Sequence, residues 1–170
     1  GTGSENFSVS SDGTVTLNSA LDFESTTSYN LTLTASDGSN TATNNLVFSV
    51  SNINEAATLS TSVASSSFAE NISTGTTIAT ASATDPENAT ISYSLSGTGS
   101  DKFSVSSDGT VTLSSGLDYE STTSYSLTLT ASDGTYSATS SISFSVTDIS
   151  ELAFSASVAA SSFAESVATG

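Results

Sequence analysis

The stretch FSVSSDGTVTL, at residues 103–113, also occurs at residues 7–17, and the same two motifs follow each copy. The later copy continues with LDYE (117–120) and YSLTLTASDG (125–134), and the earlier copy with LDFE (21–24) and YNLTLTASDG (29–38). The offset is 96 residues, both from Glu24 to Glu120 and from Asp37 to Asp133. A repeat of this length is a whole domain, so the fold question reduces to one module.

Short strands separated by polar turns are predicted throughout this module. A hairpin turn at Asp108-Gly109 separates Val105 from Val111, and in five further stretches apolar residues alternate with Ser, Thr or Asn, as strands with one buried face do: 29–35, 46–50, 91–95, 125–131 and 142–146. Residues 76–83 are expected to add another strand, whereas residues 56–67 form an irregular, Ser-rich stretch. The predicted fold class is all-β, with tandem seven-stranded antiparallel Greek-key sandwiches of the immunoglobulin-like type.

The core of the complete module is expected to hold the inward-facing apolar side chains. Outward-facing positions are Ser and Thr, which keep the opposite face soluble. The predicted core residues are Phe68, Ile78, Ile91, Tyr93, Leu95, Phe103, Val105, Val111, Leu113, Tyr125, Leu127, Leu129, Ile142, Phe144 and Val146.

The repeat divides the chain into three parts. Residues 1–55 (the first module) form the C-terminal part of one repeat, residues 56–151 (the second module) form a complete repeat, and residues 152–170 begin the next repeat or act as a donor strand. Counterparts of Thr76 to Ser96 are missing from the two partial copies. We therefore expect a window in a longer tandem array. A head-to-tail polymer, in which the tail completes a neighbour's first module, would leave those missing counterparts unexplained.

The composition excludes several classes of partner and of chemistry. The formal net charge is −16, with one Lys or Arg residue and 17 Asp or Glu residues, and the chain has no His, Cys, Met or Trp. Nucleic acid and anionic membranes are excluded as partners because both require basic patches. Thiol chemistry, imidazole bases and most transition-metal sites are also excluded. The sequence contains no signal peptide and no apolar run long enough to span a bilayer.

The acidic residues lie at predicted strand ends, which meet at the two poles of a sandwich. Several carboxylates at one pole repel each other unless a cation joins them. A set of six to eight oxygen ligands suits Ca²⁺, whereas Mg²⁺ demands a tighter octahedron.

Five ordered motifs in the chain resemble those of cadherin repeats, and in particular the cadherin-like tandem repeats of large bacterial surface proteins. They are FAEN (68–71), ATDPEN (83–88), LDYE (117–120), ASDG (131–134) and NINE (52–55). The resemblance implies Ca²⁺ between successive modules and an extracellular, non-catalytic structural role. The expected partners are neighbouring repeats or like subunits in a fibre, and glycans or other cells.

The same resemblance implies two sets of ligands. The set near residue 54 comprises Asp22, Glu24, Asn52, the carbonyl of Ile53, Asn54, Glu55, Asp85, Glu87 and Asp133. The set near residue 150 comprises Glu70, Asp118, Glu120, Asp148 and Glu151. The family linker is typically Asp-x-Asn-Asp-Asn, so Glu55 and Ser150 are departures that favour fewer than three ions per junction and a weaker second junction.

Other interpretations stay open for individual residues and for the whole chain. Any of these acids could be a plain turn residue, as Asp12 and Asp108 are expected to be. A glycosidase acid pair is disfavoured because the chain has no Trp and one Lys. Four Asn-x-Ser/Thr sequons are a weak signal of glycosylation. The alternative functions are an adhesion module for a glycan or a like module, with Tyr136 as its candidate contact, and a filament subunit that assembles by strand exchange.

Overall fold

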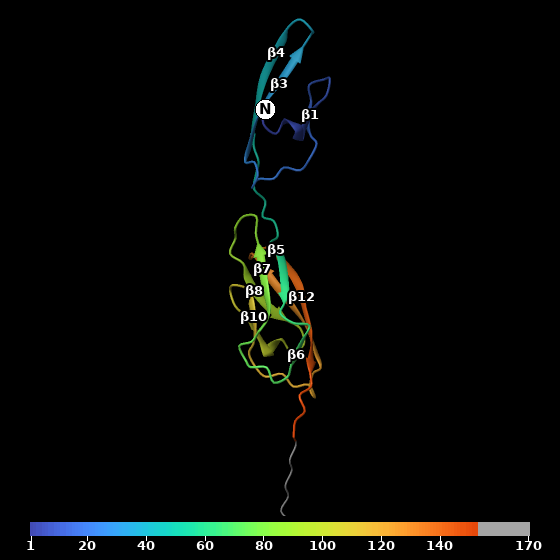
Figure 1. Cartoon of the computed structure of the whole chain (residues 1–170). Helices are drawn as coiled ribbons and strands as arrows, with labels where there is room; N and C mark the ends of the chain where they lie inside the picture. The colour runs from blue at the N-terminus through green and yellow to red at the C-terminus, as the bar shows by residue number, and fades with distance from the viewer. Residues whose placement is uncertain (153–170) are drawn as a thin grey trace, which may run out of the picture.

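The computed structural model describes residues 1–152, so the predictions for residues 153–170 lie outside the described part of the chain. The first and second modules lie end to end and are joined by the extended linker around residues 50–57 (Figure 1). In residues 1–152, no helix is long and apolar enough to cross a membrane.

The second module is a β-sandwich of two four-stranded sheets. One sheet has the strand order β5-β7-β10-β9, formed by Thr58–Val63, Thr77–Thr84, Thr110–Leu113 and Phe103–Val105. The other has the order β6-β12-β11-β8, formed by Ser67–Ala69, Ser137–Thr147, Ser124–Ser132 and Ser92–Ser96. The predicted all-β sandwich is therefore confirmed, although the module has eight strands where seven were predicted.

Two details of the second module differ from the sequence prediction. The Ser-rich stretch expected to be irregular contains β5, in which Leu59 and Val63 turn inward between exposed Ser and Thr residues. The short strand β6 then pairs with β12 in parallel, at Phe68 opposite Val146, while every other strand pair of the described residues is antiparallel. The chain thus passes from the edge of one sheet, at β5, to the edge of the other sheet, at β6.

The core lies between the two sheets and matches most of the prediction. Ile78, Leu129 and Ile142 are fully buried, and the ring of Phe144 lies edge-on to those of Phe68 and Phe103. Ile91 is an exception because it precedes β8 and does not pack against the core cluster, whereas the half-buried Tyr93 and Leu95 do. Small and loop side chains that the pattern did not indicate complete the core, namely Ala79, Ala81 and Leu117.

The first module contains counterparts of only the last four strands. Its strands are β1 (Phe7–Val9), β2 (Val15–Leu17), β3 (Ser28–Ser36) and β4 (Thr41–Ser49), and all four were predicted. β1 pairs with β2 and β3 pairs with β4, in the registers of β9 with β10 and β11 with β12. The first module has no strands in the places that β5, β6, β7 and β8 take in the second, so its inner face is open.

Candidate metal centre

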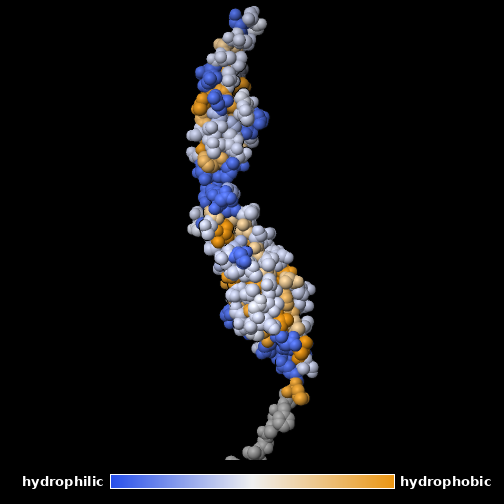
Figure 2. Space-filling model, turned by 60° about the vertical axis from the view of Figure 1, so that its left-hand side comes forward, coloured by the Kyte–Doolittle hydropathy of each residue, from blue (hydrophilic) through white to orange (hydrophobic). Residues whose placement is uncertain are grey.

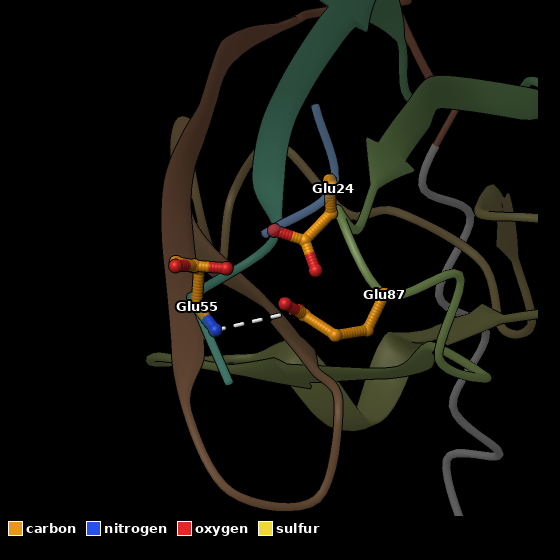
Figure 3. Close-up of side chains that lie close together, drawn as sticks. All are labelled: Glu24, Glu55 and Glu87. Carbon is orange, nitrogen blue, oxygen red and sulfur yellow. Dashed lines mark hydrogen bonds between the residues drawn. The ribbon is translucent and has the colours of Figure 1, made fainter. Parts of the chain in front are cut away.

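Three glutamates from separate segments meet where the two modules join. Glu24 comes from the loop between β2 and β3, Glu55 from the linker, and Glu87 from the turn between β7 and β8. One carboxylate oxygen from each lies within 4.8 Å of the others. Figure 3 shows the three side chains converging on a common space, with the backbone N–H of Glu55 donating to Glu87 Oε2 at 3.3 Å. We call this group the first acidic cluster.

Local turns hold two of these glutamates in place. Asp22 Oδ1 accepts a hydrogen bond from the Ser25 N–H at 3.1 Å, and its carbonyl accepts one from Thr26 N–H at 2.9 Å, which tightens the loop that carries Glu24. Asp85 Oδ1 accepts from Ala89 N–H at 2.9 Å, across the turn that carries Glu87. Both aspartates therefore stabilise the loops that carry Glu24 and Glu87.

The linker is attached to the second module by side-chain hydrogen bonds. Asn54 Nδ2 donates to Asp133 Oδ2 at 2.9 Å. The other oxygen of Asp133 accepts from the backbone N–H groups of Thr135 and Tyr136, each at 2.6 Å. These contacts, from Asn54 first, hold the pKa of Asp133 below its usual range, so this carboxylate carries its full charge at neutral pH.

The first acidic cluster is strongly self-repelling. A hydrogen bond shared with Glu87 raises the pKa of Glu55 to about 7, with desolvation and the charges of Glu87, Glu24 and Asp22 adding to the rise. The same hydrogen bond lowers the pKa of Glu87. Desolvation, followed by repulsion from Glu87, raises the pKa of Glu24. Without a cation, the raised pKa of Glu55 therefore brings its titration close to neutral pH.

Two carboxylate oxygens at this junction have no hydrogen-bond partner. Asp85 Oδ2 and Glu87 Oε1 are buried, and no donor of residues 1–152 reaches them. A buried carboxylate oxygen normally has a partner, because leaving it unsatisfied destabilises the fold. The three glutamates of the first acidic cluster offer only oxygen donors, which suit a hard cation.

A second acidic cluster lies at the other end of the second module. Oxygens of Glu70, Glu120 and Asp148 approach within 4.8 Å of one another. Glu70 is only 7% exposed, and its two oxygens accept the backbone N–H groups of Tyr119 at 2.8 Å and Ile149 at 2.7 Å. The hydrogen bond from its own N–H opposes a rise in the pKa of Glu120, but desolvation and repulsion from Glu70 and Asp148 raise it.

Six of the fourteen predicted ligand residues lie in the two acidic clusters. Asp118 holds its loop as Asp22 does, with Oδ1 accepting from Ser121 N–H at 3.1 Å. Asn52 and Ile53 lie in the exposed linker, and Glu151 is exposed beyond β12. The predicted acidic ligands that do not belong to the two groups of oxygens within 4.8 Å are Asp22, Asp85, Asp118, Asp133 and Glu151.

One feature of the sites could not be anticipated from residue types. The donors that fix Glu70 are backbone N–H groups, at Tyr119 and Ile149, and any residue but proline could supply them. The prediction that Asp12 and Asp108 are turn residues is confirmed. Each accepts from a serine hydroxyl, Ser10 or Ser106, and from a backbone N–H two residues further on.

Hydrophilic residues mark both clusters on the surface. Figure 2 shows them gathered at the waist between the modules and again at the end of the second module, while the surface between is of intermediate hydropathy. On this face, hydrophilic residues thus gather at both ends of the second module.

Comparison with known proteins identifies the type of module. Residues 64–147 match the family model of the cadherin domain. The chain is 26% identical to a protocadherin gammaB7 EC3–6 cis-dimer structure, with a TM-score of 0.60, covering 86% of this chain and 38% of that one. It is 25% identical to a structure of PcdhgB3 EC1–4, with a TM-score of 0.66 and the same coverage. No curated protein matches the chain.

A structure of mouse cadherin-23 EC22–24 is also similar, at 27% identity and a TM-score of 0.55, covering 87% of this chain and 51% of that one. The chain spans between about two-fifths and one half of these three structures. The second module is therefore a cadherin-like β-sandwich, a type of domain found in extracellular adhesion proteins.

Proposed function

We propose that the chain is a non-catalytic structural repeat of an extracellular adhesin stalk or surface fibre, in which Ca²⁺ at the junctions makes successive modules rigid. The observation that carries this proposal is the first acidic cluster. Glu24 from one module, Glu55 from the linker and Glu87 from the next module bring their oxygens within 4.8 Å of one another. No cationic side chain of the described residues neutralises them, because the only Lys or Arg residue is Lys102, in the turn before β9.

The first junction offers oxygen atoms on both sides of the linker. Glu24 would hold the cation from the first module, Asn54 and Glu55 from the linker, and Asp85 and Glu87 from the second module through their free oxygens. A bound Ca²⁺ supplies two positive charges to this set and takes six to eight oxygen ligands. Because the ligands come from three segments, binding requires the two modules and the linker to hold one relative position.

The second acidic cluster supports the same role at the next junction. Glu70 and Glu120 come from the body of the second module, and Asp148 comes from the segment that leaves it. Ser150 stands in this segment where the first linker has Asn54. A hydroxyl replaces an amide carbonyl there, so we propose weaker cation binding at this junction than at the first.

Thermal unfolding tests this proposal. The chain should be scanned with millimolar Ca²⁺, with the same concentration of Mg²⁺, and with a chelator. We expect Ca²⁺ to raise the midpoint and Mg²⁺ to raise it much less, because a ligand stabilises the state that binds it. At a concentration 100 times the Kd, the stabilisation is about 2.7 kcal/mol, a shift of several degrees for a domain of this size.

Matched variants separate cation binding from general charge effects. Glu87→Gln removes a charge and a ligand from the first acidic cluster, whereas Asp101→Asn removes a charge from the exposed turn before β9. We expect Glu87→Gln to reduce the Ca²⁺-induced shift and Asp101→Asn to preserve it. Equal unfolding midpoints in Ca²⁺, Mg²⁺ and chelator would contradict the proposal. The acidic residues would then be turn residues that keep the protein soluble.

A further inference from the structure

The middle of the linker between the two modules is not hydrogen-bonded to either of them. Residues 51–53 are exposed, with Ile53 at 72%, and no hydrogen bond within the described part of the chain joins them to another residue. Just before them, the N–H of Val50 donates to the Thr27 carbonyl at 2.9 Å, which ties the end of β4 to the first module. A segment with few buried contacts and no hydrogen bonds is the part of a chain that moves most easily.

Two hydrogen bonds attach the end of the linker to the second module. Asn54 Nδ2 donates to Asp133 Oδ2 at 2.9 Å, between residues 79 positions apart in the sequence. The N–H of Glu55 donates to Glu87 Oε2 at 3.3 Å. Ala57 is then buried, at 7% exposed, directly before β5. From Asn54 onward, the linker is thus bonded to the second module.

The acceptor of the Asn54 hydrogen bond is held in a fixed position. Asp133 lies in the turn between β11 and β12, where its other oxygen accepts the N–H groups of Thr135 and Tyr136, each at 2.6 Å. The hydroxyl of Ser132 donates to the Tyr136 carbonyl at 2.8 Å and closes the same turn. Because the acceptor is a carboxylate, the bond from Asn54 is of the stronger, charge-assisted kind.

We propose that Asn54 is a positioning residue, which docks the end of the linker onto the second module before any cation binds, and that residues 51–53 form the hinge of the junction. The side-chain amide suits this role because it donates through Nδ2 to Asp133, while its oxygen accepts no hydrogen bond from residues 1–152. The two modules then move relative to each other about the hinge, and residues 54–57 move with the second module.

The position of the hinge divides the first acidic cluster between two moving parts, and this consequence rests on the proposed function. Glu55 and Glu87 stay together on the second module, joined by the N–H of Glu55. Glu24, in the loop between β2 and β3, belongs to the first module. A cation therefore meets two carboxylates that are already in place, and it stops the motion of the hinge by binding the third.

Backbone ¹⁵N relaxation of the chain in chelator tests the proposal, because an order parameter reports the motion of each N–H separately. We expect values near 0.85 for Glu55 and for the strands of the second module, and below about 0.6 for residues 51–53. A value below about 0.6 at Glu55 as well would overturn the proposal, because the linker would then be undocked. Values near 0.85 throughout residues 51–57 would also overturn it, because there would be no hinge.

Matched variants separate the role of Asn54 from that of its neighbours. In chelator, Asn54→Ala should lower the order parameter of Glu55 from near 0.85 to below about 0.6. Asn52→Ala removes the same side chain from the exposed hinge and should leave the order parameter of Glu55 unchanged. An unchanged value in Asn54→Ala would overturn the proposal, because the contacts of Glu55 and Ala57 would then dock the linker by themselves.

Asn54→Asp distinguishes positioning from a general structural role. Its carboxylate keeps an oxygen for a cation, but it offers Asp133 no donor and repels it. We expect Glu55 of this variant to be mobile in chelator and to return to near 0.85 in Ca²⁺. Mobility in both conditions, when Ca²⁺ does order residues 51–53 of the unaltered chain, would overturn the positioning role. Residues 51–53 that stay mobile in Ca²⁺, with Glu55 of the unaltered chain ordered in chelator, would contradict the proposed function alone.

Discussion

At the scale of single residues, Glu55 reports the state of the first junction. Its pKa is raised to about 7 by the hydrogen bond with Glu87 and by desolvation. In chelator, we expect the side-chain carboxyl carbon of Glu55 to titrate near pH 7 by NMR, and Ca²⁺ should move the titration to lower pH. In a Glu87→Gln variant, Glu55 should titrate closer to its ordinary range. A midpoint near 4.5 in the unaltered chain would contradict the geometry of the cluster.

The raised pKa of Glu55 also sets the direction of a pH dependence. Between pH 4.5 and about 7, the folded state holds a proton that the unfolded state has released, so stability in chelator falls as the pH rises through this range. The lowered pKa of Glu87 acts in the opposite direction, because its contribution is present above 4.5 and is lost as the pH falls through its folded-state pKa. Scans in chelator at pH 5 and pH 8 should therefore give a higher midpoint at pH 5, and Ca²⁺ should reduce or reverse that difference.

Glu70 is the carboxylate whose removal should matter most without any cation. It is buried and accepts two backbone N–H groups, so Glu70→Gln places an amide N–H₂ against one of these donors. We expect a loss of about 1–3 kcal/mol in the free energy of unfolding, measured by urea denaturation in chelator. The exposed Glu151→Gln serves as the control, with an expected change within about 0.5 kcal/mol. Equal midpoints for the two variants would show that these hydrogen bonds contribute nothing.

At the scale of elements, one turn glycine distinguishes the complete module from the open one. Gly109 and Gly13 are counterparts with φ of 84° and 85°. A Cβ at Gly109 would collide with the carbonyl of Ala81 in β7, whereas at Gly13 it would meet no atom within 4 Å. We expect Gly13→Ala to destabilise by about 1–2 kcal/mol, from backbone strain alone, and Gly109→Ala by about 3 kcal/mol or more once β7 must shift. Hydrogen exchange resolved by module measures both, and equal losses would contradict a missing β7 neighbour at Gly13.

The sequence predicted most strands because their apolar residues alternate, as in β3, β8 and β11. It missed β5 because Thr61 occupies the inward position between Leu59 and Val63, which breaks the apolar pattern. It could not predict the parallel pairing of β6 with β12, since three residues carry no information about direction. Pairing between strands that are distant in the chain depends on how the whole sandwich closes. The local alternation of apolar and polar residues therefore does not predict it.

At the scale of the whole molecule, the sequence predicted which loops would meet but not which atoms. The motifs placed Glu24, Glu55 and Glu87 at one junction, and the structure brings these three together. The sequence did not predict which predicted ligands would instead bond within their own loops. The carboxylates of Asp22 and Asp118 are each engaged by a backbone N–H of their own loop. Residue type and order indicate a site, while the division between direct ligands and supporting residues requires coordinates.

The central claim is that a cation at the first junction fixes the relative position of the two modules. Small-angle X-ray scattering of the chain in Ca²⁺ and in chelator, at concentrations low enough to keep it monomeric, tests this claim most directly. We predict an extended profile typical of one rigid particle in Ca²⁺, and a flexible profile with a broader distance distribution in chelator and in Glu87→Gln. Identical rigid profiles in all three samples would contradict it, because the two modules would then hold one relative position without a cation.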